Sequence, residues 1–69
     1  MNHRRAIATA RQRAKRTGTT QVVYFDTDAG EHFVTSLAVY TYQQGQFTHT
    51  WIVGTYAADE PANTSRSKS

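Results

Sequence analysis

The chain is divided in two by charge, and the division coincides with a change in the residues that favour secondary structure. Six basic residues precede the first acid, Asp26, whereas the stretch from Gln21 to Glu60 has no lysine or arginine and holds all five acids. The first part is rich in alanine and arginine, which favour helix, and the second is rich in β-branched and aromatic residues, which favour strand. The sequence therefore predicts a basic helix followed by a sheet without positive charge.

Residues 3–17 are predicted to form one helix. Asn2 is a good residue to begin it and Gly18 a good residue to end it. One arc of the helical wheel carries the small and apolar side chains, namely His3, Ala6, Ile7, Ala10, Ala14 and Thr17. The remaining arc carries the basic residues Arg4, Arg5, Arg11, Arg13, Lys15 and Arg16. We expect the apolar stripe to pack on the sheet and the basic arc to face solvent or an anionic partner.

Residues 20–26, 32–43 and 47–57 are predicted to form three antiparallel strands connected as a meander. Asp28-Ala29-Gly30 suits a turn with glycine in the left-handed conformation, and Gln44-Gly45 suits a two-residue hairpin. The expected fold class is α+β, with one N-terminal basic amphipathic helix packed on a three-stranded antiparallel β-meander, in a single domain of residues 1–58. Residues 59–69 have no apolar residue beyond Ala62 and are expected to form a flexible polar tail.

The predicted register places Phe25 opposite Phe33 and Asp26 opposite His32. The sheet then has two apolar faces, and a single helix covers only the more aliphatic one. The other face is expected to lack cover from this chain and to form an interface, because exposed apolar patches mark interaction sites and tyrosine and tryptophan are enriched in binding hot spots. Its predicted interface residues are Tyr24, Tyr40, Tyr42, Phe47, Trp51 and Val53.

Three kinds of partner suit this aromatic face. A homodimer that packs two such faces together is the main hypothesis. A different protein and a single-stranded nucleic acid stacked on the aromatic rings are the alternatives. The nucleic acid is disfavoured on this face because the predicted sheet has no basic side chain to hold phosphates.

Several kinds of chemistry are not expected. The chain has no cysteine, which excludes disulfides and cysteine-type zinc sites. The predicted register separates His32 and His49 by about 25 Å at about 3.3 Å per residue, so no metal site is expected. Without paired carboxylates or a glycine-rich loop, neither catalysis nor a cofactor is expected. The absence of a long apolar run or a secretory signal leads us to expect no membrane association and a cytoplasmic location.

The sequence pI of about 9.7 favours acidic partners. The leading functional hypothesis is a small non-enzymatic module that dimerises through its Tyr/Trp face and uses the Arg-rich helix to bind nucleic acid or a nucleoprotein complex. The alternative is an inhibitor or adaptor, of the compact type found in phages and mobile elements, that blocks an acidic surface of a host protein.

Overall fold

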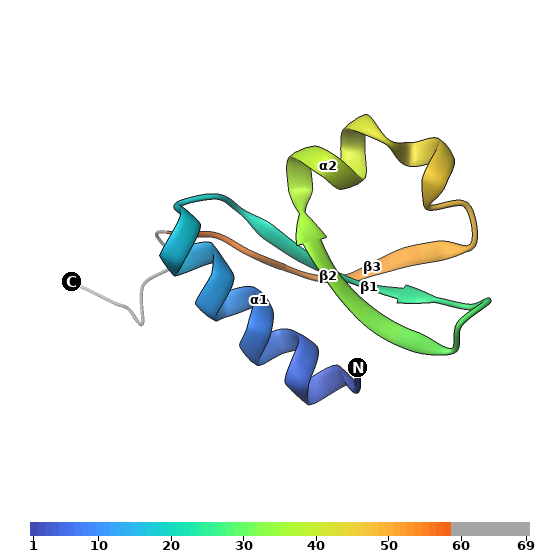
Figure 1. Ribbon diagram of the computed structural model, residues 1–69, viewed down its shortest axis with the longest axis horizontal. Helices are drawn as coiled ribbons and strands as arrows, with labels where there is room; N and C mark the ends of the chain where they lie inside the picture. Colours follow the sequence, from blue (N-terminus) through green and yellow to red (C-terminus); the bar gives the residue numbers. More distant parts are fainter. Residues whose placement is uncertain (59–69) are drawn as a thin grey trace.

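The computed structural model describes residues 1–58, and the tail expected over residues 59–69 lies outside them. The chain forms a helix, two strands, a short helix, a turn of 3₁₀-helix and a third strand. The elements are α1 His3–Thr17, β1 Gln21–Asp26, β2 Glu31–Ser36, α2 Leu37–Tyr42, η1 Gln44–Gln46 and β3 Thr50–Tyr56 (Figure 1). The α+β class and the three antiparallel strands are confirmed.

The helix α1 forms over the residues that the sequence predicts because its signals are local. The Asn2 side chain accepts a hydrogen bond from the Arg5 amide at 2.8 Å. At the other end Gly18 has a φ of 71° and donates its N–H to the Ala14 carbonyl at 2.8 Å. The alanines at every fourth position, Ala6, Ala10 and Ala14, are fully buried. They let α1 approach the sheet closely, so the predicted apolar stripe is confirmed.

The predicted meander is wrong, because the strand order is β2-β1-β3 and β1 lies in the centre. The predicted second strand ends at Ser36, and residues 37–42 form α2 instead. The Ser36 hydroxyl accepts from the Val39 amide at 3.1 Å and so begins this helix. Residues 44–46 form η1, not a two-residue hairpin turn. The 37–49 segment thereby carries the chain across the sheet, and β3 pairs with the free edge of β1 (Figure 1).

The first hairpin is shifted by one residue from the predicted register. Asp26 pairs with Glu31 and Phe25 with His32, so the loop has four residues, 27–30, and ends at Gly30 with a φ of 68°. The Asp26 carboxylate accepts from the amides of Asp28 and Ala29 at 2.9 and 3.2 Å, which stabilises the longer loop. Because side chains alternate between faces, this shift moves every β2 residue to the face opposite the predicted one.

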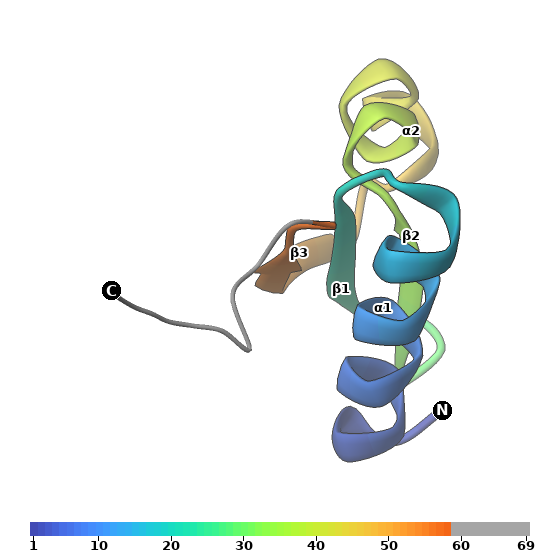
Figure 2. The same ribbon diagram turned by 90° about the vertical axis from the view of Figure 1, so that its left-hand side faces the viewer.

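The core lies between α1 and the first two strands. Ala6 and Ala10 pack on Val23, with Ile7, Val34 and Tyr56 around them. Figure 2 shows α1 in front of β1 and β2, with β3 displaced to one side, in agreement with the weaker packing of α1 on β3. Few large side chains are fully buried: Val22 and Val23 are the largest in the described part of the chain. The sheet is therefore well covered on its β2 side and poorly covered on its β3 side.

Candidate nucleic-acid interface

The basic residues of α1 lie on the side of the helix that faces away from the core. Arg4, Arg5, Arg11, Lys15 and Arg16 are exposed, and Arg13 is half-buried. Within residues 1–58, none of these side chains forms an ion pair with an acid. Their positive charge is therefore not neutralised by the part of the chain that the structure describes.

Two of these side chains contact the sheet, one at β2 and the other at β3. The Arg13 guanidinium donates to the Val34 carbonyl of β2 at 3.5 Å. The Arg11 guanidinium lies over the Tyr56 ring of β3, 5.4 Å from its centroid. The helical wheel then assigns the basic residues to two rows. The β3-side row is Arg4, Arg11 and Lys15, and the β2-side row is Arg5, Arg13 and Arg16.

The position of the Tyr56 ring depends on a glycine two residues earlier in β3. A Cβ at Gly54 would lie 2.7 Å from the Tyr56 hydroxyl oxygen and 3.0 Å from the ring, so only glycine leaves room for the ring to lie over the strand. In the sequence, the spacing Gly54-x-Tyr56 is the feature that indicates this packing, because residues two apart in a strand lie on the same face.

Four rings form a series across the sheet on the α1 side. Trp51 lies 5.3 Å from Phe25, Phe25 lies 5.0 Å from His32, and His32 stacks on His3 of α1 at 4.8 Å, each between ring centroids. The Trp51 residue is 53% exposed. The prediction that Trp51 shares a face with Tyr24 is wrong, because β3 has a bulge at Val53 that changes the alternation of its side chains. Trp51 therefore lies on the same face of the sheet as the basic helix.

The remaining aromatic residues occupy the other face and are partly covered. The Tyr24 ring contacts Phe33, Tyr40 and Phe47, with centroids 5.1–5.8 Å apart. The Thr50 hydroxyl donates to the Phe47 carbonyl at 2.7 Å, so its oxygen is free to accept from the Tyr40 hydroxyl, also at 2.7 Å. The predicted absence of cover for this face is therefore wrong, since the 37–47 segment folds over it.

Burial raises the pKa of the Tyr24 hydroxyl above its ordinary value, and the nearby charges of Asp26 and Tyr40 raise it further. Tyr24 of β1, Tyr40 of α2 and Phe47 thus form a half-buried cluster between the sheet and the 37–47 segment. The other predicted interface residues are scattered: Tyr42 projects from α2 and is 93% exposed, and Val53 sits at the bulge of the edge strand. The structure does not bring the predicted interface residues together on one surface.

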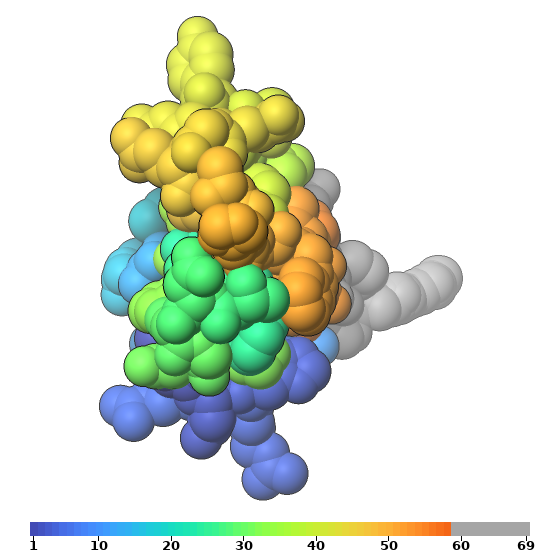
Figure 3. Space-filling model, turned by 90° about the vertical axis from the view of Figure 1, so that its right-hand side faces the viewer, coloured from blue at the N-terminus to red at the C-terminus, as the bar shows by residue number. Residues whose placement is uncertain are grey.

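The acids of the sheet gather around the first hairpin. Glu31 pairs with the N-terminal ammonium group, and Asp28 pairs with His49 at 3.0 Å. The predicted cross-strand pair of Asp26 with His32 is wrong, since Asp26 pairs with Glu31, and His32 stacks on His3 and meets the Phe25 ring edge-on. Figure 3 shows this hairpin, in green, between the N-terminal residues, in blue, and the segment that leads to β3, in yellow and orange. Among residues 1–58, negative charge is therefore concentrated around this hairpin.

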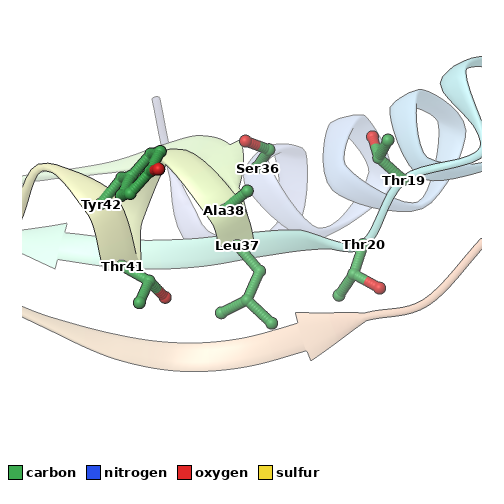
Figure 4. A pocket seen from close by; sticks show the side chains of 7 residues that line it. All are labelled: Thr19, Thr20, Ser36, Leu37, Ala38, Thr41 and Tyr42. Carbon is green, nitrogen blue, oxygen red and sulfur yellow. The ribbon is translucent and has the colours of Figure 1, made fainter.

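A shallow apolar pocket of about 590 Å³ lies where α2 begins. It is lined by Thr19, Thr20, Ser36, Leu37, Ala38, Thr41 and Tyr42 (Figure 4). None of these lining residues is acidic, basic or a histidine. No group of three or more acidic or histidine side chains in residues 1–58 is placed to hold a metal ion.

Two further observations bear on function. None of the helices in residues 1–58 has the length and apolar character needed to cross a bilayer. Comparison with known proteins gave no match: no family model fits the chain, and no curated protein or solved structure is similar to it. Function is therefore inferred from the geometry of the chain itself.

Proposed function

We propose that this protein is a small non-enzymatic binding module whose helix α1 holds the phosphate backbone of a nucleic acid. The observation that carries the proposal is the exposed basic arc of α1, which has no acidic partner among residues 1–58. Arginine and lysine side chains of this kind contact phosphates and position a protein on the strand without reading its sequence.

The length of the basic arc suits several consecutive phosphates. Helix α1 has 15 residues, which corresponds to about 22 Å at 1.5 Å per residue. Arg4 and Lys15 mark its two ends on the β3 side, with Arg11 between them. Binding through such contacts releases counterions, so the affinity is expected to fall steeply with salt.

The exposed Trp51 supports a single-stranded ligand. Base stacking was disfavoured on the predicted aromatic face because the predicted sheet has no basic side chain to hold phosphates. In the structure Trp51 faces the same side as α1, next to the Phe25 ring. A base stacked on Trp51 and phosphates held by the β3-side row combine the two elements that single-strand binding uses.

The experiment measures binding of a fluorescent oligonucleotide by anisotropy at a series of salt concentrations. Arg4→Gln/Lys15→Gln lowers the net charge by two at the proposed site. The matched control, Gln44→Glu/Thr48→Glu, makes the same change at exposed positions of the η1 region, away from the basic arc. We expect the first variant to bind a single-stranded oligonucleotide more weakly and to show a salt slope shallower by about 1.4 units, at about 0.7 per phosphate contact, and the control to behave like the parent.

Equal effects of the two double variants would contradict the site, because binding would then depend on net charge alone. Failure of the parent to bind oligonucleotides at low salt would contradict the function. In that case the same basic arc is available to an acidic protein surface, and capture of one protein from nuclease-treated lysate, lost in Arg4→Gln/Lys15→Gln, would support that alternative.

A further inference from the structure

The two edge strands, β2 and β3, differ in whether their outward-facing backbone groups form hydrogen bonds with other residues of the 1–58 range. At the β2 edge the Met1 carbonyl accepts from the His32 amide at 3.1 Å, and the Arg13 guanidinium donates to the Val34 carbonyl. These contacts satisfy backbone groups that would otherwise pair with another strand. At β3, no group of residues 1–58 forms a hydrogen bond to the backbone of 51–56 apart from the pairing with β1. The edge of β3 is therefore open where that of β2 is blocked.

The residues of β3 lack the charged side chains and proline that often protect an edge strand, and the bulge at Val53 is the protective feature that Thr50–Tyr56 retains. Thr50–Tyr56 has neither charge nor proline and consists mainly of β-branched and aromatic residues, the composition that favours strand pairing. Three successive side chains, Trp51, Ile52 and Val53, are exposed. Because successive residues point to opposite faces, apolar surface is exposed on both sides of this strand.

We infer that two copies of this chain pair antiparallel along β3 and form one continuous six-stranded sheet. A second copy is the occupant favoured by three observations. The strand carries no charge, so like charges do not meet in the pair. The pairing closes on a two-fold axis, so no open strand of β3 remains. The outer edges of the resulting sheet are both β2, the edge that Met1 and Arg13 block.

This contact replaces the face-to-face dimer expected from the sequence. Antiparallel pairing of identical strands places the two-fold axis perpendicular to the sheet, so both copies of α1 lie on the same face. Since α1 packs mainly on β1 and β2, two helices lie roughly 20 Å apart at about 4.8 Å per strand. Their β3-side rows, each with Arg4, Arg11 and Lys15, face each other across the Trp51 side chains.

The inference does not depend on nucleic-acid binding, because it is based on β3 alone. The helices repel each other at this separation only weakly at physiological salt, where the screening length is about 8 Å. The dimer should therefore tighten as salt rises, whereas nucleic-acid binding weakens. The opposite salt dependences make failure of one proposal distinguishable from failure of the other. A single strand pair is a small interface, so we expect a dissociation constant in the micromolar range or weaker.

The first test is sedimentation of nuclease-treated full-length protein from about 1 μM to about 1 mM, a range that spans such affinities. We expect a monomer that converts to a dimer, and Val53→Lys should raise the dissociation constant at least about tenfold by placing like charges at the strand pair. Val39→Lys on α2 is the matched control, because Val39 and Val53 are both 39% exposed. Val53→Glu shows whether the effect depends on the sign of the added charge.

Each outcome of this test decides the inference. Dimer loss in Val53→Lys and Val53→Glu, with Val39→Lys unchanged and all variants folded by circular dichroism, supports pairing at β3. Dimer loss in Val39→Lys alone would overturn it in favour of contact through α2. A monomer at every concentration would also overturn it, including the case in which residues 59–69 cover β3.

A second test is independent of added charge. The chain has no cysteine, so a single one introduced at Val53, the central residue of β3, reports on its own copy in the partner. In an antiparallel pair centred there the two Cβ atoms lie within disulfide range. We expect Val53→Cys to cross-link under mild oxidation and Val39→Cys not to. Equal cross-linking of both variants would overturn the inference.

Discussion

The Arg11 guanidinium lies 5.4 Å from the centroid of the Tyr56 ring and joins the basic helix to the edge strand. Each partner belongs to a different part of the chain, the basic first part and the sheet, which has no lysine or arginine. Through this contact the β3-side row of α1 is attached to β3, the strand that is least covered by the rest of the fold. The Tyr56 ring also lies next to Gly54, where a Cβ would come within 3.0 Å of it.

Replacement of Arg11 by glutamine should lower the free energy of unfolding by about 0.5–1 kcal/mol, the range for an exposed cation–π contact. Lys15→Gln removes a positive charge from the same row, but Lys15 is exposed and its side chain forms no hydrogen bond, ion pair or cation–π contact within residues 1–58, so the stability of this variant should match the parent. Urea denaturation followed by circular dichroism measures both. A similar loss in the two variants would show that charge on the helix, not the Tyr56 contact, is responsible.

Replacement of Gly54 by alanine should destabilise the protein because the new methyl group displaces the Tyr56 ring. The overlap at 2.7 Å is expected to cost about 1–3 kcal/mol, offset in part by about 0.4–1 kcal/mol from the reduced freedom of the unfolded chain. Gly45→Ala is the control, because a Cβ there meets nothing within 4 Å. Thermal unfolding should show a lower Tm for Gly54→Ala only, and an unchanged Tm would contradict the packing of Tyr56 on Gly54.

The helix α1 could be predicted from the sequence because its determinants are local. The capping residues Asn2 and Gly18 lie next to the residues they cap, and the spacing of Ala6, Ala10 and Ala14 marks the buried side. The strand-forming residues of the second part likewise indicate a sheet. Both predictions need only neighbours within a few positions of each other.

The arrangement of the sheet could not be predicted in the same way, because it depends on contacts distant in sequence. Residues 37–42 are rich in residues that favour strand, yet they form a helix that places Tyr40 against Tyr24 and Thr50. A sheet with two apolar faces needs two covers, and the chain uses this segment as the second one. The bulge at Val53 then decides the face on which Trp51 lies. Pattern and propensity alone do not contain this information.

The partly buried Tyr24 hydroxyl should make the protein less stable at alkaline pH. Its pKa in the folded state is above the ordinary value of 10.0, so near and above pH 10 the unfolded chain loses a proton that the folded chain retains. The free energy of unfolding therefore falls as pH rises through this range. Below this range the Tyr24 hydroxyl is protonated in both states, so this loss of stability does not occur.

Tyr24→Phe removes the group that titrates and should show a smaller alkaline loss of stability than the parent. Tyr42→Phe removes a hydroxyl from an exposed side chain and should retain the loss seen in the parent. Urea denaturation at several values between about pH 8 and about pH 11, the range that brackets an ordinary tyrosine pKa, measures the difference. Identical pH profiles for Tyr24→Phe and the parent would contradict the role of Tyr24.

Trp51 and Tyr42 provide a direct comparison of the two sides of the molecule in nucleic-acid binding. Both are exposed aromatic residues, but Trp51 lies on the face that carries α1, whereas Tyr42 projects from α2. If a base stacks on Trp51, Trp51→Ala should weaken binding of a single-stranded oligonucleotide by about 1–3 kcal/mol, whereas Tyr42→Ala should bind like the parent. The salt slope of Trp51→Ala should remain unchanged, because stacking releases no counterions. Equal loss in both variants, or a reduced salt slope in Trp51→Ala, would place the strand elsewhere on the surface.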